Sequence, residues 1–119
     1  MALTAMEMVA NAKQQITEID TVTANGQLQT SLILDVREPA EYAGGHLPGA
    51  INIPRGLLEF KIDATPEFQG KQQAPIVVYC QTGGRSALAA LALNQLGYAG
   101  AVSMAGGFKA WSEAGLPLG

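Results

Sequence analysis

The cysteine Cys80 is the only one in the chain, and it lies in the stretch VVYCQTGGRSALAALAL. The apolar residues before it predict a buried strand and the alanine-rich run after it predicts a helix, so the thiol stands where the strand ends. Gly83 and Gly84 permit the positive φ of a sharp turn. A turn at a helix start can direct successive backbone N–H groups, and the positive end of the helix dipole, at one atom. The stretch therefore predicts an anion cradle.

A cysteine beside such a cradle is a candidate nucleophile. Helix N-termini and nearby cations stabilise thiolates, and the thiolate is the form that attacks. Cys80 would then need no histidine base, and Arg85 adds a cation to the same loop. The alternative is an inert, small, buried side chain at the end of a strand. That alternative gives the two glycines and Arg85 no purpose, so we favour the nucleophile.

Several polar residues are candidates for orienting this loop. Asp35 ends an apolar strand, at the sheet edge where open α/β proteins place functional groups, and we expect it to accept hydrogen bonds. We place Arg37 on the opposite face of that strand, where it could pair with Glu41. Arg85 has two alternatives, an ion pair with a carboxylate such as Asp35 or a clamp on an anionic ligand. Ser86 is the expected cap of the helix after the loop.

The remaining chemically suggestive residues favour structural roles. His46, the only histidine, lies in the turn-like stretch GGHLPGA, so we do not expect it to act as a general base. One histidine and one cysteine do not make a zinc site, and we predict neither a metal nor a cofactor. Phe108 and Trp111 are three apart on a predicted helix and are expected in the core.

The elements that must position the loop can be inferred from apolar periodicity. A first amphipathic helix is predicted over Leu3–Gln15, with Thr4 as cap and Glu7 completing a capping box. Further helical segments are predicted around EPAEYAGG, RGLLEF, SALAALALNQL and GGFKAWSEAG, and strands around QITEID, SLILDV, AINIP, PIVVY and AVSMA. The polar segment KIDATPEFQGKQQ is expected to be a surface connection. Alternating strands and helices predict a three-layer α/β domain with a mostly parallel sheet.

Composition sets limits on partners. The chain has 119 residues, which suits one domain. A net charge of -3 and a pI near 4.9 give no basic surface for nucleic acid. The first residues have no basic region before an apolar segment, and no apolar run is long enough to cross a bilayer, so no membrane association is expected. We predict a cytoplasmic monomer, and a lone cysteine without an internal disulfide agrees with a reducing compartment.

Two further stretches carry a resemblance to a known family. LILDVREPAEYAGGHLPGAINIP and GGFKAWSEAGLPL resemble the first and the C-terminal signatures of single-domain rhodaneses, and the similarity runs from about Ile16 to Leu118. It implies a five-stranded parallel sheet of order 1-5-4-2-3 with helices on both faces. Residues 16–119 would form this domain, and residues 1–15 a helix that packs on it or extends it.

The resemblance also implies an activity. Cys80 would take the outer sulfur of a donor such as thiosulfate, hold it as a persulfide and pass it to cyanide or a thiol. The substrate-binding residues would be those of the loop, whose amides surround the sulfur: Gln81, Thr82, Gly83, Gly84, Arg85 and Ser86. Asp35 and Arg37 would orient that loop. Without a second cysteine, the persulfide must be removed by an external acceptor.

Three alternatives are carried forward. Cysteine-dependent phosphatases and arsenate reductases share this architecture, but have five residues between cysteine and arginine where this chain has four. The domain could instead be a dedicated persulfide relay or adaptor for a protein partner, docking at the first helix or at residues 64–73. Redox sensing is the third, although there is no second cysteine to resolve an oxidised thiol.

Overall fold

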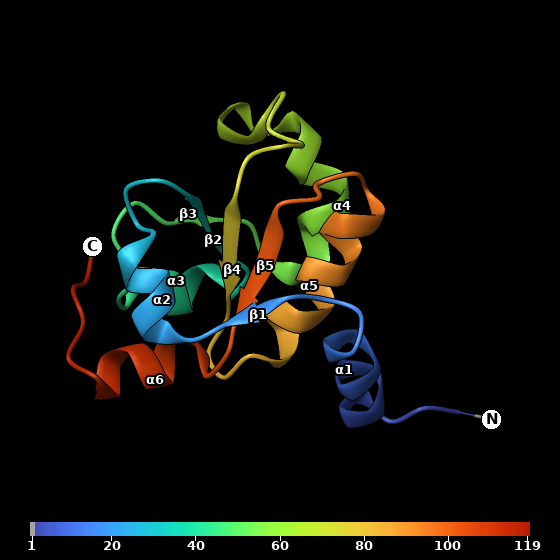
Figure 1. Ribbon diagram of the computed structural model, residues 1–119, viewed down its shortest axis with the longest axis horizontal. Coiled ribbons are helices and arrows are strands. Elements are labelled where there is room, and N and C mark those ends of the chain that lie inside the picture. The colour runs from blue at the N-terminus through green and yellow to red at the C-terminus, as the bar shows by residue number, and fades with distance from the viewer. Residues whose placement is uncertain (1) are drawn as a thin grey trace.

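The computed structural model describes residues 2–119, and over these residues its centre is a parallel sheet of five strands (Figure 1). The strands are β1 (Glu18–Ile19), β2 (Leu32–Asp35), β3 (Ile51–Asn52), β4 (Ile76–Tyr79) and β5 (Ala101–Met104). Their order is β1-β5-β4-β2-β3, and every neighbouring pair is parallel. The predicted strand order is confirmed.

Helices cover both faces of the sheet, which confirms the three-layer prediction. The α-helices are α1 (Ala5–Lys13), α2 (Thr21–Gly26), α3 (Pro39–Ala43), α4 (Leu58–Lys61), α5 (Gly84–Gln95) and α6 (Gly107–Glu113). Three short 3-10 turns are η1 (Arg55–Leu57), η2 (Ile62–Ala64) and η3 (Pro66–Phe68). Figure 1 shows α4 and α5 on one side of the sheet and α2, α3 and α6 on the other.

Strand β4 shows how the sequence produces two cores. All four of its residues are buried, because β4 lies in the middle of the sheet between β5 and β2. Alternate residues point to opposite faces. Ile76 and Val78 join the core beneath α4 and α5, while Val77 and Tyr79 join the core on the α2 and α6 side. The carboxyl end of β4, where Cys80 follows, is thus fixed on both faces.

Helix α1 begins at the predicted capping box. The Thr4 hydroxyl accepts from the Glu7 amide, and the Glu7 carboxylate accepts from the Thr4 amide. The helix packs against α5, and Ala12 is its buried residue. Val9 lies beside the first turn of α5, since a Cβ built on Gly84 would be 3.7 Å from Val9 Cγ2. Helix α1 therefore lies next to the start of α5.

One expectation about the fold was wrong. The polar segment of residues 61–73 is not merely a surface connection, because Ile62 and Phe68 are fully buried in the core. The two 3-10 turns η2 and η3 direct these side chains inward while the polar residues around them stay outside. The hydroxyl of Tyr98, in the connection between α5 and β5, donates to Asp63 and ties the segment to that connection. Within residues 2–119, no helix has the length and apolar character needed to span a bilayer.

Candidate active site

Cys80 lies at the carboxyl end of β4, directly before the turn that starts α5. Gly83 is the N-cap of α5 and has a φ of +111°, a conformation that favours glycine. The predicted sharp turn is therefore present. The Cys80 side chain is only 1% exposed, so the thiol faces the inside of the turn rather than solvent.

The turn directs backbone donors at the thiol. The amide of Gly83 lies 3.1 Å from Cys80 Sγ and the amide of Ser86 lies 3.3 Å from it, and both donate to the sulfur. The sulfur also stands at the N-terminal end of a 12-residue helix, where the helix dipole favours negative charge. Gln81, Thr82, Gly84 and Arg85 form the rest of the turn, and Thr82 is exposed at its rim. Two backbone donors and the positive end of the helix dipole are thus directed at the Cys80 sulfur.

Ser86 does not cap the helix, which corrects the sequence prediction. The helix begins three residues earlier than a cap at Ser86 would place it, because Gly83 adopts a left-handed conformation and is the N-cap. Ser86 is instead fully buried inside the first turn. Its hydroxyl lies 3.5 Å from Cys80 Sγ, 3.2 Å from the Gly83 carbonyl oxygen and 2.9 Å from the hydroxyl of Ser103 on β5.

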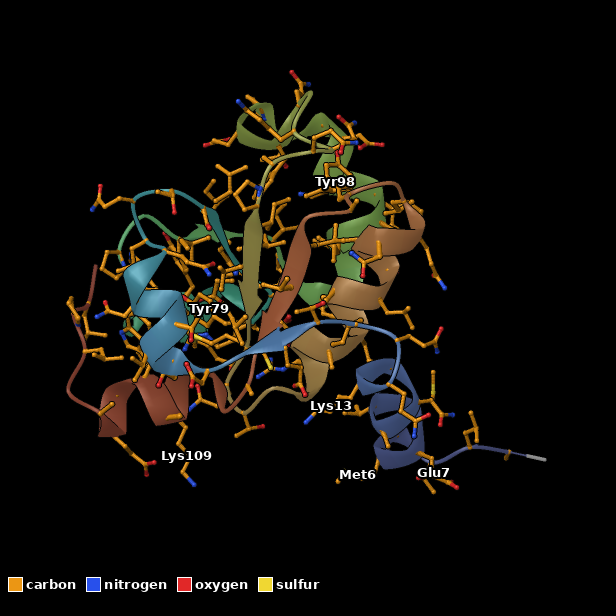
Figure 2. All side chains as sticks on the ribbon, viewed as in Figure 1. Met6, Glu7, Lys13, Tyr79, Tyr98 and Lys109 are labelled. Atoms are coloured by element: carbon orange, nitrogen blue, oxygen red, sulfur yellow. The ribbon has the colours of Figure 1, made fainter. Side chains whose placement is uncertain are left out.

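The carbonyl groups of the loop are held by α6. The Phe108 amide donates to the Cys80 carbonyl at 2.8 Å, and the Lys109 amide donates to the Gln81 carbonyl at 3.0 Å. Gly107 has a φ of +62° and lies so close to the loop that a Cβ would come within 2.6 Å of the Cys80 oxygen. The Lys109 side chain projects away from the body of the molecule (Figure 2). That α6 holds the loop was not predicted from the sequence. The sequence feature that indicates this contact is the glycine pair after β5.

Asp35 and Arg37 meet, so they do not lie on opposite faces as expected. Arg37 Nη2 is 2.7 Å from Asp35 Oδ2, and both side chains are almost completely buried. Residues two apart in extended chain share a face, which is the physical reason for the correction. The Arg37 guanidinium also packs over the Phe108 ring at 4.3 Å and lies 3.4 Å from Gln81 Oε1. Arg37 thus connects Asp35 with the Cys80 loop.

Tyr79 completes this buried network. Its hydroxyl donates to Asp35 Oδ2 at 2.6 Å and accepts from the Leu47 amide at 3.1 Å. Burial, followed by the hydrogen bond to the Asp35 carboxylate, raises the pKa of Tyr79 above its usual value. The hydroxyl therefore remains protonated and acts as a donor. Figure 2 shows Tyr79 on the side of the sheet that α2 covers.

Arg85 forms an ion pair, but not with Asp35. Its guanidinium donates to both carboxylate oxygens of Glu41 at 2.8 and 3.1 Å. The hydrogen bond from Arg85 lowers the pKa of Glu41 to about 2, and the pair raises the pKa of Arg85. The predicted pair between Arg37 and Glu41 is therefore wrong, because each is committed elsewhere. The Arg85 side chain remains 37% exposed, so it is open to a ligand.

Comparisons with known proteins assign the chain to a family. Residues 16–114 match the sequence model of the Rhodanese-like domain. The chain belongs to the rhodanese family. A sulfurtransferase of Allochromatium vinosum is 33% identical over 106 residues, which cover 87% of this chain and 94% of that protein. The human thiosulfate:glutathione sulfurtransferase is 34% identical over 105 residues, covering 81% of this chain and 89% of that protein.

A solved structure resembles the whole rhodanese chain, α1 included. It is a Rhodopseudomonas palustris protein described as being of unknown function and a possible tyrosine phosphatase. It is 32% identical, with a TM-score of 0.90, and the match covers 100% of this chain and 96% of that one. The relatives named as sulfurtransferases, together with the fold, support sulfurtransferase activity in general for this rhodanese.

The other residues of interest occupy structural positions in the rhodanese fold. His46 stacks on the Tyr42 ring at 4.0 Å, and its Nδ1 lies 3.1 Å from the Tyr42 carbonyl oxygen. Trp111 is fully buried, and its indole N–H donates to the Pro117 carbonyl. Among residues 2–119, no three histidine, cysteine, aspartate or glutamate side chains gather into a group that could hold a metal ion.

Proposed function

We propose that this rhodanese transfers a sulfane sulfur from a small donor such as thiosulfate to a thiol or cyanide through a persulfide on Cys80. The observation that carries the proposal is the pair of amides, from Gly83 and Ser86, that donate to Cys80 Sγ at the start of α5. The same donors that stabilise a thiolate also stabilise the charge that develops on sulfur during transfer. No cofactor is needed for this chemistry.

The first half-reaction charges the enzyme. The Cys80 thiolate attacks the outer sulfur of thiosulfate and forms a new S–S bond. The bond between the two thiosulfate sulfur atoms breaks, and its electron pair leaves with sulfite. The terminal sulfur of the Cys80 persulfide carries the negative charge within the loop. This half-reaction needs neither an oxidant nor a reductant.

The second half-reaction discharges it. An acceptor nucleophile attacks the terminal sulfur, the S–S bond to Cys80 breaks, and the thiolate is restored. Cyanide leaves as thiocyanate, and a thiolate acceptor leaves as a persulfide. Because Cys80 is the only cysteine in the chain, no internal thiol can take the sulfur. The two half-reactions therefore follow a ping-pong scheme.

The other loop residues bind and orient in this proposal. Arg85 attracts the anionic end of the donor, and its ion pair with Glu41 fixes the guanidinium at the edge of the loop. Gln81 and Thr82 line the approach, and the amides of Gly84 and Arg85 complete the ring around the sulfur. Asp35 and Arg37 orient the loop through the contact between Arg37 and Gln81.

Loop size favours sulfur over phosphate chemistry. The chain has four residues between Cys80 and Arg85, which makes a smaller ring than the five-residue loop of cysteine-dependent phosphatases. A small ring fits one sulfur atom, whereas a tetrahedral oxyanion needs more amides around it. Hydrolysis of p-nitrophenyl phosphate at a rate comparable to sulfur transfer, and lost in Cys80→Ser, would contradict the proposal.

Intact mass spectrometry tests the persulfide directly. The wild-type protein and Cys80→Ser are incubated with thiosulfate, weighed, and then treated with cyanide. We expect the wild type alone to gain one sulfur atom and to lose it as thiocyanate. If Cys80 stays unmodified with both thiosulfate and polysulfide, the proposed sulfur transfer is wrong.

A further inference from the structure

Strand β5 carries a buried hydroxyl where an apolar side chain would suffice. Ser103 is completely buried, and it shares the face of β5 that carries Ala101 toward α5. Its backbone amide already bonds to the Thr17 carbonyl oxygen in the sheet, so the side chain is not needed for strand pairing. Burying a hydroxyl is unfavourable unless it is hydrogen-bonded. The Ser103 hydroxyl therefore requires a hydrogen-bond partner inside the protein.

The hydroxyl of Ser103 has one partner among residues 2–119, the hydroxyl of Ser86 at 2.9 Å. Ser86 has two further neighbours, the Gly83 carbonyl oxygen at 3.2 Å and Cys80 Sγ at 3.5 Å. A serine hydroxyl has one hydrogen to donate and two lone pairs that accept. If Ser86 donated to Ser103, the hydrogen of Ser103 would be buried without an acceptor. Ser103 therefore donates to Ser86.

This assignment determines what Ser86 can do. With one of its two lone pairs accepting from Ser103, the Ser86 hydroxyl keeps its own hydrogen for the Gly83 carbonyl or for the sulfur. When Cys80 is a thiol, its S–H can donate to Ser86 Oγ and the Ser86 hydrogen can stay on the Gly83 carbonyl. When Cys80 is a thiolate, the Ser86 hydrogen can rotate to the sulfur and join the amides of Gly83 and Ser86. A hydroxyl that accepts a hydrogen bond is also a stronger donor.

We propose that Ser103 is a positioning residue that acts through the Ser86 hydroxyl to stabilise negative charge on Cys80 Sγ. Ser103 lies 23 positions after Cys80 in the sequence and belongs to neither the loop nor the helix that holds the thiol. The proposal deepens the proposed function and rests on Cys80 being the nucleophile. The two serines make a hydrogen-bonded chain from strand β5 to the reacting atom.

Thiolate absorbance in the ultraviolet, followed against pH, tests this chain without any sulfur donor. Cys80→Ser serves as the blank, because the protein has no other thiol. In Ser103→Ala we expect the titration midpoint to move upward by about half a pH unit, which is about a threefold loss of thiolate below the midpoint. Ser86→Ala should move it at least as far. Ser112→Ala, on the exposed face of α6, should leave it unchanged.

The double variant Ser86→Ala/Ser103→Ala separates action through Ser86 from a direct or general effect. We expect its midpoint to equal that of Ser86→Ala alone, since Ser103 has nothing to act on once the Ser86 hydroxyl is gone. Two independent shifts that add would contradict the proposal. An unchanged midpoint in Ser103→Ala would also contradict it.

A second pair of variants guards against a merely structural effect at position 103. Ser103→Thr keeps the hydroxyl, and Ser103→Val replaces it with a side chain that has nearly the shape of threonine but no hydroxyl. We expect the threonine variant to titrate nearer to the wild type than the valine variant, and equal midpoints in the two would overturn the proposal. The mass assay tests sulfur transfer, and the titration tests the role of Ser103. If the protein forms no persulfide but its variants show the expected shifts of the titration midpoint, sulfur transfer is refuted while the effect of Ser103 on the Cys80 sulfur stands.

Discussion

Replacing Gly107 by alanine should damage the active loop, because the added Cβ would clash with the backbone of that loop. Gly107 has a φ of +62°, and a Cβ there would lie 2.5 Å from the carbonyl carbon and oxygen of Gln81 and 2.6 Å from the Cys80 oxygen. These are backbone atoms of the loop and cannot rotate away as a flexible side chain could. Either the loop or the start of α6 must move.

Gly115→Ala is a matched control for the loss in free energy of unfolding that we expect from Gly107→Ala. Gly115 has a φ of +69° and no heavy atom within 4 Å of a built Cβ, so Gly115→Ala carries the left-handed strain alone, about 1–2 kcal/mol. Gly107→Ala adds the displacement of two hydrogen bonds, from Phe108 and Lys109 to the loop carbonyls. At roughly 0.5–1.5 kcal/mol for each bond, Gly107→Ala should cost about 1–3 kcal/mol more than the control.

Urea unfolding followed by the fluorescence of the buried Trp111 measures this difference in the free energy of unfolding. Persulfide formation with thiosulfate measures the loop itself, and we expect Gly107→Ala to load at least about tenfold more slowly than Gly115→Ala, an activation cost of about 1.4 kcal/mol. Equal stability and equal loading in the two variants would refute the claim that the α6 amides hold the Cys80 loop.

Other predictions concern the buried network and the ion pair. Tyr79→Phe removes the donor to Asp35 and leaves the buried Leu47 amide without its acceptor. We therefore expect the free energy of unfolding, measured by urea denaturation, to fall by about 1–3 kcal/mol. An unchanged urea midpoint would show that the network does not stabilise the fold. The pKa of Glu41 is lowered to about 2 by Arg85, so the stability it contributes is present above the unfolded pKa near 4.5 and is lost as the pH falls toward 2. Glu41→Gln should therefore be less stable than the wild type at neutral pH and should approach it in acid, and a gap that widens in acid would contradict the assignment. Since the pair is about one-third exposed, we expect a difference of at most about 1 kcal/mol, reduced further by salt.

The elements and the central loop of this fold could be predicted because their signals are local. A few neighbouring residues are enough to predict the backbone conformation at three places. These are the capping box at Thr4, the apolar run of β4 and the glycines after Cys80. The sheet order and the sulfur chemistry were predicted from the resemblance of longer stretches to a family. The fold confirms the sheet order, and the related sulfurtransferases support sulfurtransferase activity in general, while the persulfide on Cys80 stays a prediction.

The contacts that could not be predicted join residues far apart in the sequence. Glu41 and Arg85 are 44 positions apart, and nothing local distinguishes Glu41 from other carboxylates as the partner. The donors from α6 are backbone amides, and the glycine pair that permits their close approach does not show which loop they reach. The position of Arg37 was different, because the strand alternation, correctly applied, places it on the same side as Asp35.

The dependence of the loop on α6 also bears on how the protein matures during synthesis. Chains are made from the N-terminus, and Cys80 emerges before β5 and before the amides of Phe108 and Lys109 that hold the loop carbonyls. Strand β1 is likewise made before β5, which is the strand that it pairs with in the sheet. Such non-local pairings form late in folding. On a nascent chain the loop around Cys80 therefore lacks the two hydrogen bonds to its carbonyl groups until α6 docks.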